Sequence, residues 1–281
     1  MIKFSLPGYI SHEPIIKFFY NKQKEHPEYF IENRIIDSAY DLPGNLIWNG
    51  GRIMWEYQKC EKIYDLVDSY RQLGLSLKHT CTNIFITDTL LLDVLSNQYL
   101  AYCELEGDSV VVYTEDLADY IKNNYPKYRI IWSTARGEKD INKINSMSKN
   151  DMFVLDYNHN HNEDILSQLK HHQNIEFLCA ENCIGNCPER LEHYKTMSLV
   201  QLRVPKVTEL QCPYAKPDHL SNFCVDTLSK TNAITNEDID YLYSTYHIEH
   251  FKLSGRVLPP YFMIEIILYY LIKPEYRNML R

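Results

Sequence analysis

The feature that most constrains this fold is an alternation of short apolar segments with longer amphipathic ones, repeated along the whole chain. Most of the short segments span four or five residues and are rich in β-branched and aromatic side chains. Apolar runs of this length are typical of strands buried on both faces of a parallel sheet. We predict strands at Ile2–Ser5, Leu46–Trp48, Leu75–His79, Ser109–Tyr113, Arg129–Ser133, Met152–Asp156, Ile175–Cys179 and His250–Leu253.

A helical pattern follows each predicted strand. In Cys60–Leu73, for example, apolar residues recur at i, i+3, i+4 and i+7, which places them on one helix face. Eight strands that alternate with helices predict an α/β fold, a (βα)8 TIM-type barrel. An open doubly wound sheet is the alternative, but no glycine-rich phosphate loop follows the first strand. The other helices are expected after Thr87, after Thr114, and at Glu138–Met147, Glu163–Lys170, Pro188–Met197 and Pro259–Ile272.

One connection is much longer than the rest. Residues 198–249 separate the seventh helix from the eighth strand and contain Cys212 and Cys224. Within them, Thr235 and Asp238 have the spacing of a helix N-cap, which predicts a helix up to Tyr246. Loops of this length are uncommon unless they have a function. We therefore predict a single barrel domain over 1–281, with 198–249 inserted as a lid.

The charge balance and the apolar stretches limit the function classes. The chain has 29 Lys and Arg against 37 Asp and Glu, a formal charge of -8, which disfavours a broad face that neutralises nucleic-acid phosphates. The longest apolar stretch, Tyr261–Ile272, is interrupted by Glu265 and is too short to span a bilayer. The first residues have no apolar signal region. We expect a cytoplasmic protein that does not enter the membrane.

The eight cysteines divide into two sets. Cys60, Cys81 and Cys103 are scattered, and we interpret them as small buried hydrophobic residues. The other five lie in one window, where a C-x3-C turn leads into the helix that begins at Pro188, a position that lowers thiol pKa values. Sulfur ligands favour an iron–sulfur cluster or zinc, although chance clustering of reduced thiols is a third reading. The five are Cys179, Cys183, Cys187, Cys212 and Cys224.

Barrel active sites form where the strands end. Asp156 ends the sixth predicted strand and Glu181 follows the seventh. Lys252 and Arg256 flank the end of the eighth, and with Arg52 they would make a positive mouth that suits a carboxylate or phosphate. An Arg256 that forms a salt bridge at the rim is an equally good reading. We interpret His159 and His161 as parts of a polar loop.

Two of these segments resemble a known family. His250–Arg256, followed by Pro259–Tyr261 and a closing Tyr276-Arg277, is similar to a hallmark of the collagenase-like peptidases (peptidase family U, thirty-second group), and Ile175–Leu178 resembles the strand before their cysteine loop. The chain departs from that pattern at Ser254, where the family has an acidic residue, and in its tighter C-x3-C spacing.

The resemblance implies a barrel that holds a 4Fe-4S cluster on four cysteines and assists oxygen-independent hydroxylation of RNA bases or of a quinone precursor. It implies Cys183, Cys187, Cys212 and Cys224 as ligands, with Cys179 as the alternative fourth. Asp156, Glu181, Lys252 and Arg256 would then face an anionic small molecule or a nucleotide- or RNA-type substrate.

Two other functions are kept beside this one. The barrel could hold a structural zinc or cluster and serve as a subunit or scaffold for a partner protein or a second copy, without catalysis of its own. Literal proteolysis is weaker, because no nucleophile–His–acid arrangement can be picked out of the sequence.

Overall fold

The computed structural model describes residues 1–51, 60–208, 212 and 227–281. Its eight strands form a closed parallel barrel in sequence order, and the last strand pairs with the first. This confirms the predicted (βα)8 fold. The strands are β1 (Ile2–Pro7), β2 (Arg34–Asp41), β3 (Ser76–Cys81), β4 (Ser109–Val112), β5 (Arg129–Trp132), β6 (Met152–Val154), β7 (Ile175–Cys179) and β8 (His250–Leu253).

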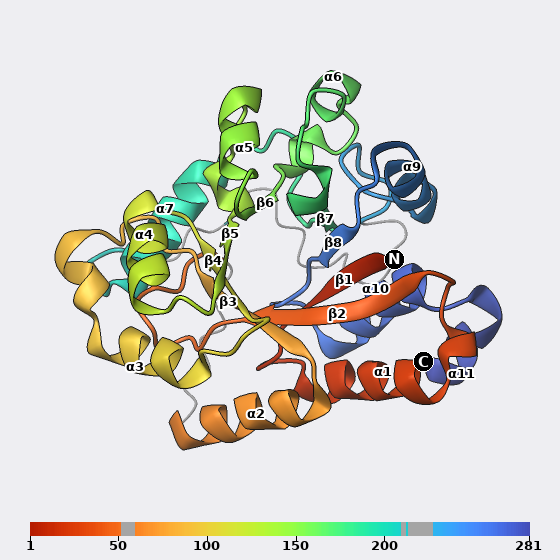
Figure 1. Ribbon diagram of the computed structural model, residues 1–281, viewed down its shortest axis with the longest axis horizontal. Helices are drawn as coiled ribbons and strands as arrows, with labels where there is room; N and C mark the ends of the chain where they lie inside the picture. Colours follow the sequence, from red (N-terminus) through yellow and green to blue (C-terminus); the bar gives the residue numbers. More distant parts are fainter. Residues whose placement is uncertain (52–59, 209–211, 213–226) are drawn as a thin grey trace.

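Helices surround the strands, with α1 and α2 on one side of the barrel and α5 and α6 on the opposite side (Figure 1). No described helix is long and apolar enough to cross a membrane. The described helices are α1 (Glu13–Glu25), α2 (Cys60–Leu73), α3 (Val94–Cys103), α4 (Glu115–Asn124), α5 (Ile141–Met147), α6 (Glu163–Leu166), α7 (Arg190–Gln201), α9 (Asn236–Tyr246), α10 (Pro260–Leu271) and α11 (Arg277–Leu280).

The predicted second strand was wrong. Strand β2 lies at Arg34–Asp41, whereas Leu46–Trp48 belongs to the turn region that follows it. The apolar run of β2 is interrupted by Asp37, Ser38 and Asp41, and Ser38 Oγ donates a hydrogen bond to Ser5 Oγ on the neighbouring strand β1. A continuous apolar run is therefore absent from the true strand. Trp48 is fully buried for another reason: its indole N–H donates to the Leu90 carbonyl and anchors the loop.

The core has two parts. The larger part lies between the strands and the helices and contains Cys81 and Cys103, which confirms their predicted burial. The smaller part fills the barrel interior and is formed by Val111, Ile131, Met152, Val154, Tyr157 and Leu178. Also buried are Lys78 of β3 and Glu176 of β7, which form an ion pair with a separation of 2.6 Å. The barrel interior is thus partly charged.

The long connection contains the predicted helix. Thr235 caps α9 in a reciprocal capping box with Asp238, as the spacing indicated. Helix α7 continues to Gln201, so the predicted insertion begins inside that helix at Ser198. Cys224 and Arg52 lie outside the described residues. The lid function of 198–249 stays a prediction.

Candidate functional site at the barrel mouth

A cavity of about 80 Å³ lies at the carboxyl ends of the strands. It brings together three of the predicted site residues, Glu181, Lys252 and Arg256, which come from the ends of β7 and β8. Hydroxyl groups are frequent around them. The other described lining residues are Tyr40, Gly50, Gly51, Thr80, Thr82, Val111, Ser133, Thr134, Leu178, Tyr194, Ser254 and Gly255.

Lys252 extends from β8 and is only 7% exposed. Its Nζ lies 4.0 Å from the centroid of the Tyr40 ring, a cation–π contact. The Tyr40 hydroxyl is in turn held by donating to the Leu253 carbonyl. Burial lowers the pKa of Lys252 to about 8; the nearby Glu176 carboxylate opposes this shift, whereas the positive charges of Lys78 and Arg256 add to it. Lys252 is therefore an amine that loses its proton unusually easily.

Arg256 is fixed by the ends of two other strands. Its Nη1 donates to Thr80 Oγ1 at 2.6 Å and lies 3.4 Å from Asp41 Oδ1. Burial raises the pKa of Asp41 even though Arg256 opposes that shift. The buried Nε of Arg256 has no hydrogen-bond partner among the described residues. Arg256 is therefore a buried, oriented guanidinium, and it forms the salt bridge that the alternative reading expected, with Asp41.

Glu181 is held in place by its own loop and by α7. Its Oε1 accepts a hydrogen bond from the Cys183 backbone N–H, and its Oε2 lies 3.6 Å from Arg190 Nη1. The Arg190 guanidinium lies over the rings of Tyr157 and Tyr194, 4.2 and 5.2 Å from their centroids. The carboxylate at this mouth is thus oriented by a half-buried arginine that the sequence did not reveal, since an arginine in the first turn of a helix is ordinarily exposed.

Asp156 has a different setting from the other predicted residues. It caps the short 3-10 turn Tyr157–His159, and its Oδ1 accepts hydrogen bonds from the backbone and side-chain N–H groups of Asn158. It does not line the cavity at the mouth. The observed contacts give Asp156 a role in shaping the loop after β6.

The cysteines of the C-terminal window are spread over several environments. Cys179 is fully buried in the core between strands and helices, and burial raises the pKa of its thiol. Cys183, Cys187 and Cys212 are half-buried. Within the described part of the chain, no three His, Cys, Asp or Glu residues are grouped so that they could hold a metal ion. The described cysteines therefore do not by themselves form a cluster site.

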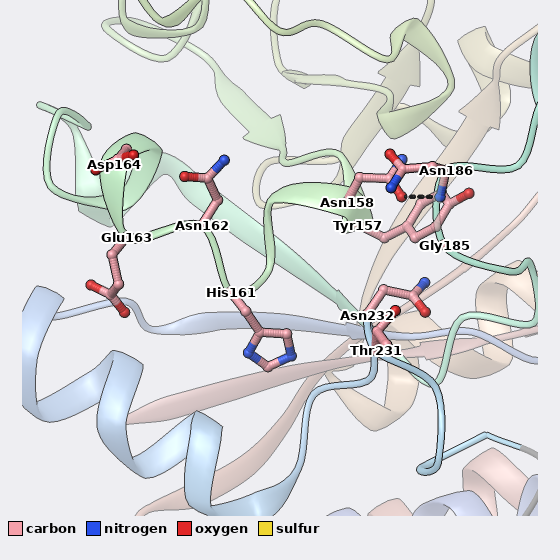
Figure 2. A pocket seen from close by; sticks show the side chains of 10 residues that line it. All are labelled: Tyr157, Asn158, His161, Asn162, Glu163, Asp164, Gly185, Asn186, Thr231 and Asn232. Carbon is pink, nitrogen blue, oxygen red and sulfur yellow. Dashed lines mark hydrogen bonds between the residues drawn. The ribbon is translucent and has the colours of Figure 1, made fainter.

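A second, more open pocket of about 450 Å³ lies beside the mouth. Figure 2 shows that the loop after β6, the loop after β7 and the segment before α9 enclose it, with a hydrogen bond from the Asn186 backbone N–H to Asn158 Oδ1. His161 connects two of these segments through a 2.6 Å hydrogen bond between its Nε2 and the Ala233 carbonyl. Neutral amide groups dominate the lining, which is Tyr157, Asn158, His161, Asn162, Glu163, Asp164, Gly185, Asn186, Thr231 and Asn232.

Comparison with known proteins adds evidence on the fold. No family model matches the chain, and no curated protein matches it. Among solved structures, the chain is similar to one described as "The Structure of the U32 Peptidase Mk0906", with 14% sequence identity and a TM-score of 0.55. The match covers 92% of this chain and 94% of that chain. The chain therefore shares the (βα)8 barrel fold of that structure.

Proposed function

We propose that this barrel is an enzyme that binds a small anionic substrate at its C-terminal mouth. The observation that carries the proposal is the shared cavity of Lys252 and Arg256, two buried cationic side chains. Buried positive charge is unfavourable until an opposite charge compensates it. Asp41 pairs with Arg256, and the single charge of Glu176 acts on both Lys78 and Lys252. An incoming anion would therefore supply the remaining compensation.

The size and chemistry of the cavity narrow the substrate class. A volume of about 80 Å³ has room for roughly six water molecules, which suits a carboxylate or phosphate on a short carbon skeleton. A planar guanidinium such as that of Arg256 recognises either anion by directed hydrogen bonds. Glu181 and the hydroxyls of Thr80 and Ser254 would supply groups for proton transfer to the bound molecule.

Titration calorimetry with oxalate and with inorganic phosphate tests this function. We expect one of them to bind, and Arg256→Gln to weaken its affinity at least tenfold because the oriented guanidinium is lost. Lys62→Gln is the matched control, since it removes one positive charge from the exposed surface of α2. Equal loss of affinity in the two variants, or no binding of either anion to the wild type, would contradict the proposal.

The iron–sulfur hypothesis is a separate proposal, and it rests on the sequence. Cys183, Cys187, Cys212 and Cys224 would hold a 4Fe-4S cluster that provides electron transfer or Lewis acidity for oxygen-independent hydroxylation. Because the described residues form no metal-holding group, we derive no catalytic step through the cluster. A structural metal in a non-catalytic scaffold would use the same thiols.

Proteolysis has less support from the site. The similar structure is described as a peptidase. However, the described residues that line the cavity at the mouth include no histidine that could activate a serine or threonine.

A further inference from the structure

We infer that Lys252 is a nucleophile that forms an imine with the carbonyl group of an anionic carbonyl compound, the simplest class being the 2-oxo acids. This inference rests on the anion site proposed above and adds the reacting group of the substrate to it. Three features of Lys252 support it: its position on the barrel, its charged surroundings and the cavity that it shares with Arg256.

The position of Lys252 is suited to a reaction that needs fixed geometry. Strand β8 pairs on both sides, with Lys252 opposite Ser5 of β1 and Leu178 of β7. Side chains on closed barrel strands are held more precisely than those on loops. Burial and the Tyr40 ring further restrict the lysine, and its side chain lines the cavity.

The surroundings of Lys252 favour the neutral amine, which is the reactive form. Lysines become nucleophilic when they are desolvated or placed beside another cation. Both conditions hold here, because Lys252 is buried and the positive charges of Lys78 and Arg256 act on it. Glu176 would favour the ammonium form, but its carboxylate is already in a 2.6 Å ion pair with Lys78.

Arg256 accounts for the choice of a 2-oxo acid. It lies four positions after Lys252, just beyond the end of β8, and lines the same small cavity. In a 2-oxo acid the carboxylate is bonded directly to the carbonyl carbon, so a single short molecule can reach both side chains.

The proposed step is balanced without an oxidant or reductant. The Nζ lone pair of neutral Lys252 forms a bond to the carbonyl carbon, the electron pair of the C=O π bond moves to the oxygen, and one of the two amine protons passes from the nitrogen to that oxygen. The carbinolamine then loses this oxygen as water together with the remaining amine hydrogen, and a C=N bond forms. Hydroxyls of Thr80, Ser133 and Ser254 line the cavity and can transfer these protons.

Reductive trapping tests the inference. The full chain is incubated with pyruvate and sodium cyanoborohydride at pH 8, digested, and mapped by mass spectrometry. We expect a carboxyethyl adduct on Lys252 that forms at least ten times faster than the adduct on exposed Lys62. Labelling of Lys252 no faster than that of Lys62, or its absence, would overturn the inference. Because the wild type is mapped directly, the result does not depend on the folding of any variant.

Two comparisons separate this inference from the proposed anion site. Acetone has the carbonyl group without the carboxylate, so trapping at Lys252 with acetone but no advantage for pyruvate would support the nucleophile and overturn the role of Arg256. Calorimetric binding of pyruvate with no adduct at Lys252 would leave the anion site in place and overturn the nucleophile. Lys252→Arg keeps the positive charge but has no nucleophilic amine, and we expect it to lose the adduct at position 252.

Discussion

The ion pair between Lys78 and Glu176 is an unusual element of a barrel interior. Both side chains are almost fully buried, and their charged atoms lie 2.6 Å apart. Burial alone would raise the pKa of Glu176, but Lys78 and Lys252 outweigh it and lower that pKa. The carboxylate therefore stays ionised, and its single negative charge acts on both lysines. Its removal affects both folding and the site.

Glu176→Gln is expected to reduce the free energy of unfolding by about 3 to 5 kcal/mol, because it leaves Lys78 charged and unpaired in the interior. Urea denaturation of the variant measures this loss. The control is the double variant Lys78→Met/Glu176→Met, which removes both charges and is expected to recover most of the stability. A single variant that loses less than about 1 kcal/mol would show that the pair has little effect.

The reactivity of Lys252 is expected to depend on pH in a distinctive way. Below its pKa of about 8 the amine is protonated, so the reactive fraction rises with pH and levels off above that value. An unperturbed lysine, with a pKa of about 10.4, continues to gain reactivity over about two further pH units. Trace acetylation with acetic anhydride, with N-acetyl-lysine amide as the internal reference, measures both profiles. Parallel profiles up to pH 10 would contradict the shift.

For single residues, the sequence predicted candidate site side chains at the ends of strands but not those that come from helices. Glu181, Lys252 and Arg256 were selected because the carboxyl ends of barrel strands meet at one face, and they do line one cavity there; their role in a site stays a prediction. Arg190 and Tyr194 were missed, since α7 is placed by a loop whose path no local pattern defines. The same reasoning selected Asp156, whose carboxylate instead caps its own turn.

Among the elements, the turn between β8 and α10 determines where Arg256 lies. Gly255 has a φ of +145°, and a Cβ at this position would lie 2.8 Å from Met263 Sδ. Its carbonyl accepts a hydrogen bond from the Leu258 backbone N–H, which closes the turn. Glycine suits both the positive φ and the lack of space for a Cβ, so backbone geometry selects the residue before Arg256.

Gly255→Ala is expected to cost about 1 to 3 kcal/mol of stability and to weaken anion binding, because the strained turn displaces the neighbouring guanidinium. Thermal unfolding and calorimetry with the bound anion measure the two effects. Gly74→Ala is the matched control: Gly74 also has a positive φ, of +74°, but a Cβ there would meet nothing within 4 Å. The prediction is wrong if both variants bind the anion equally well.

The elements themselves were predicted unevenly, for a physical reason. Strands with a continuous apolar run, such as β4 and β6, were predicted correctly because they are buried on both faces. Strand β2 was missed because Asp37, Ser38 and Asp41 interrupt its apolar run, and the apolar turn at Leu46–Trp48 took its place in the prediction. The number of strands was nevertheless right, and this number fixes the closed barrel.

For the molecule as a whole, the open prediction concerns the cysteines. If Cys183, Cys187, Cys212 and Cys224 hold a 4Fe-4S cluster, protein purified without oxygen will be brown and contain iron in the ratio of that cluster. Cys183→Ala is expected to remove the colour, whereas Cys81→Ala, a change in the apolar core, is expected to keep it. Elemental analysis with visible absorption measures this, and a colourless protein with one zinc per chain would contradict the cluster.

Closure of the barrel by β1 and β8 also decides when the site can exist. These neighbours are the first and last strands, so β1 has no partner on one edge until the final strand has been synthesised. At about 5 to 20 residues per second, the ribosome delivers β8 roughly 12 to 50 s after β1. Until then an unpaired strand edge is exposed, a recognised hazard for aggregation. Lys252 and Arg256 are synthesised with that strand and the turn after it. The nascent chain can therefore complete its barrel mouth only when the open edge of β1 becomes paired.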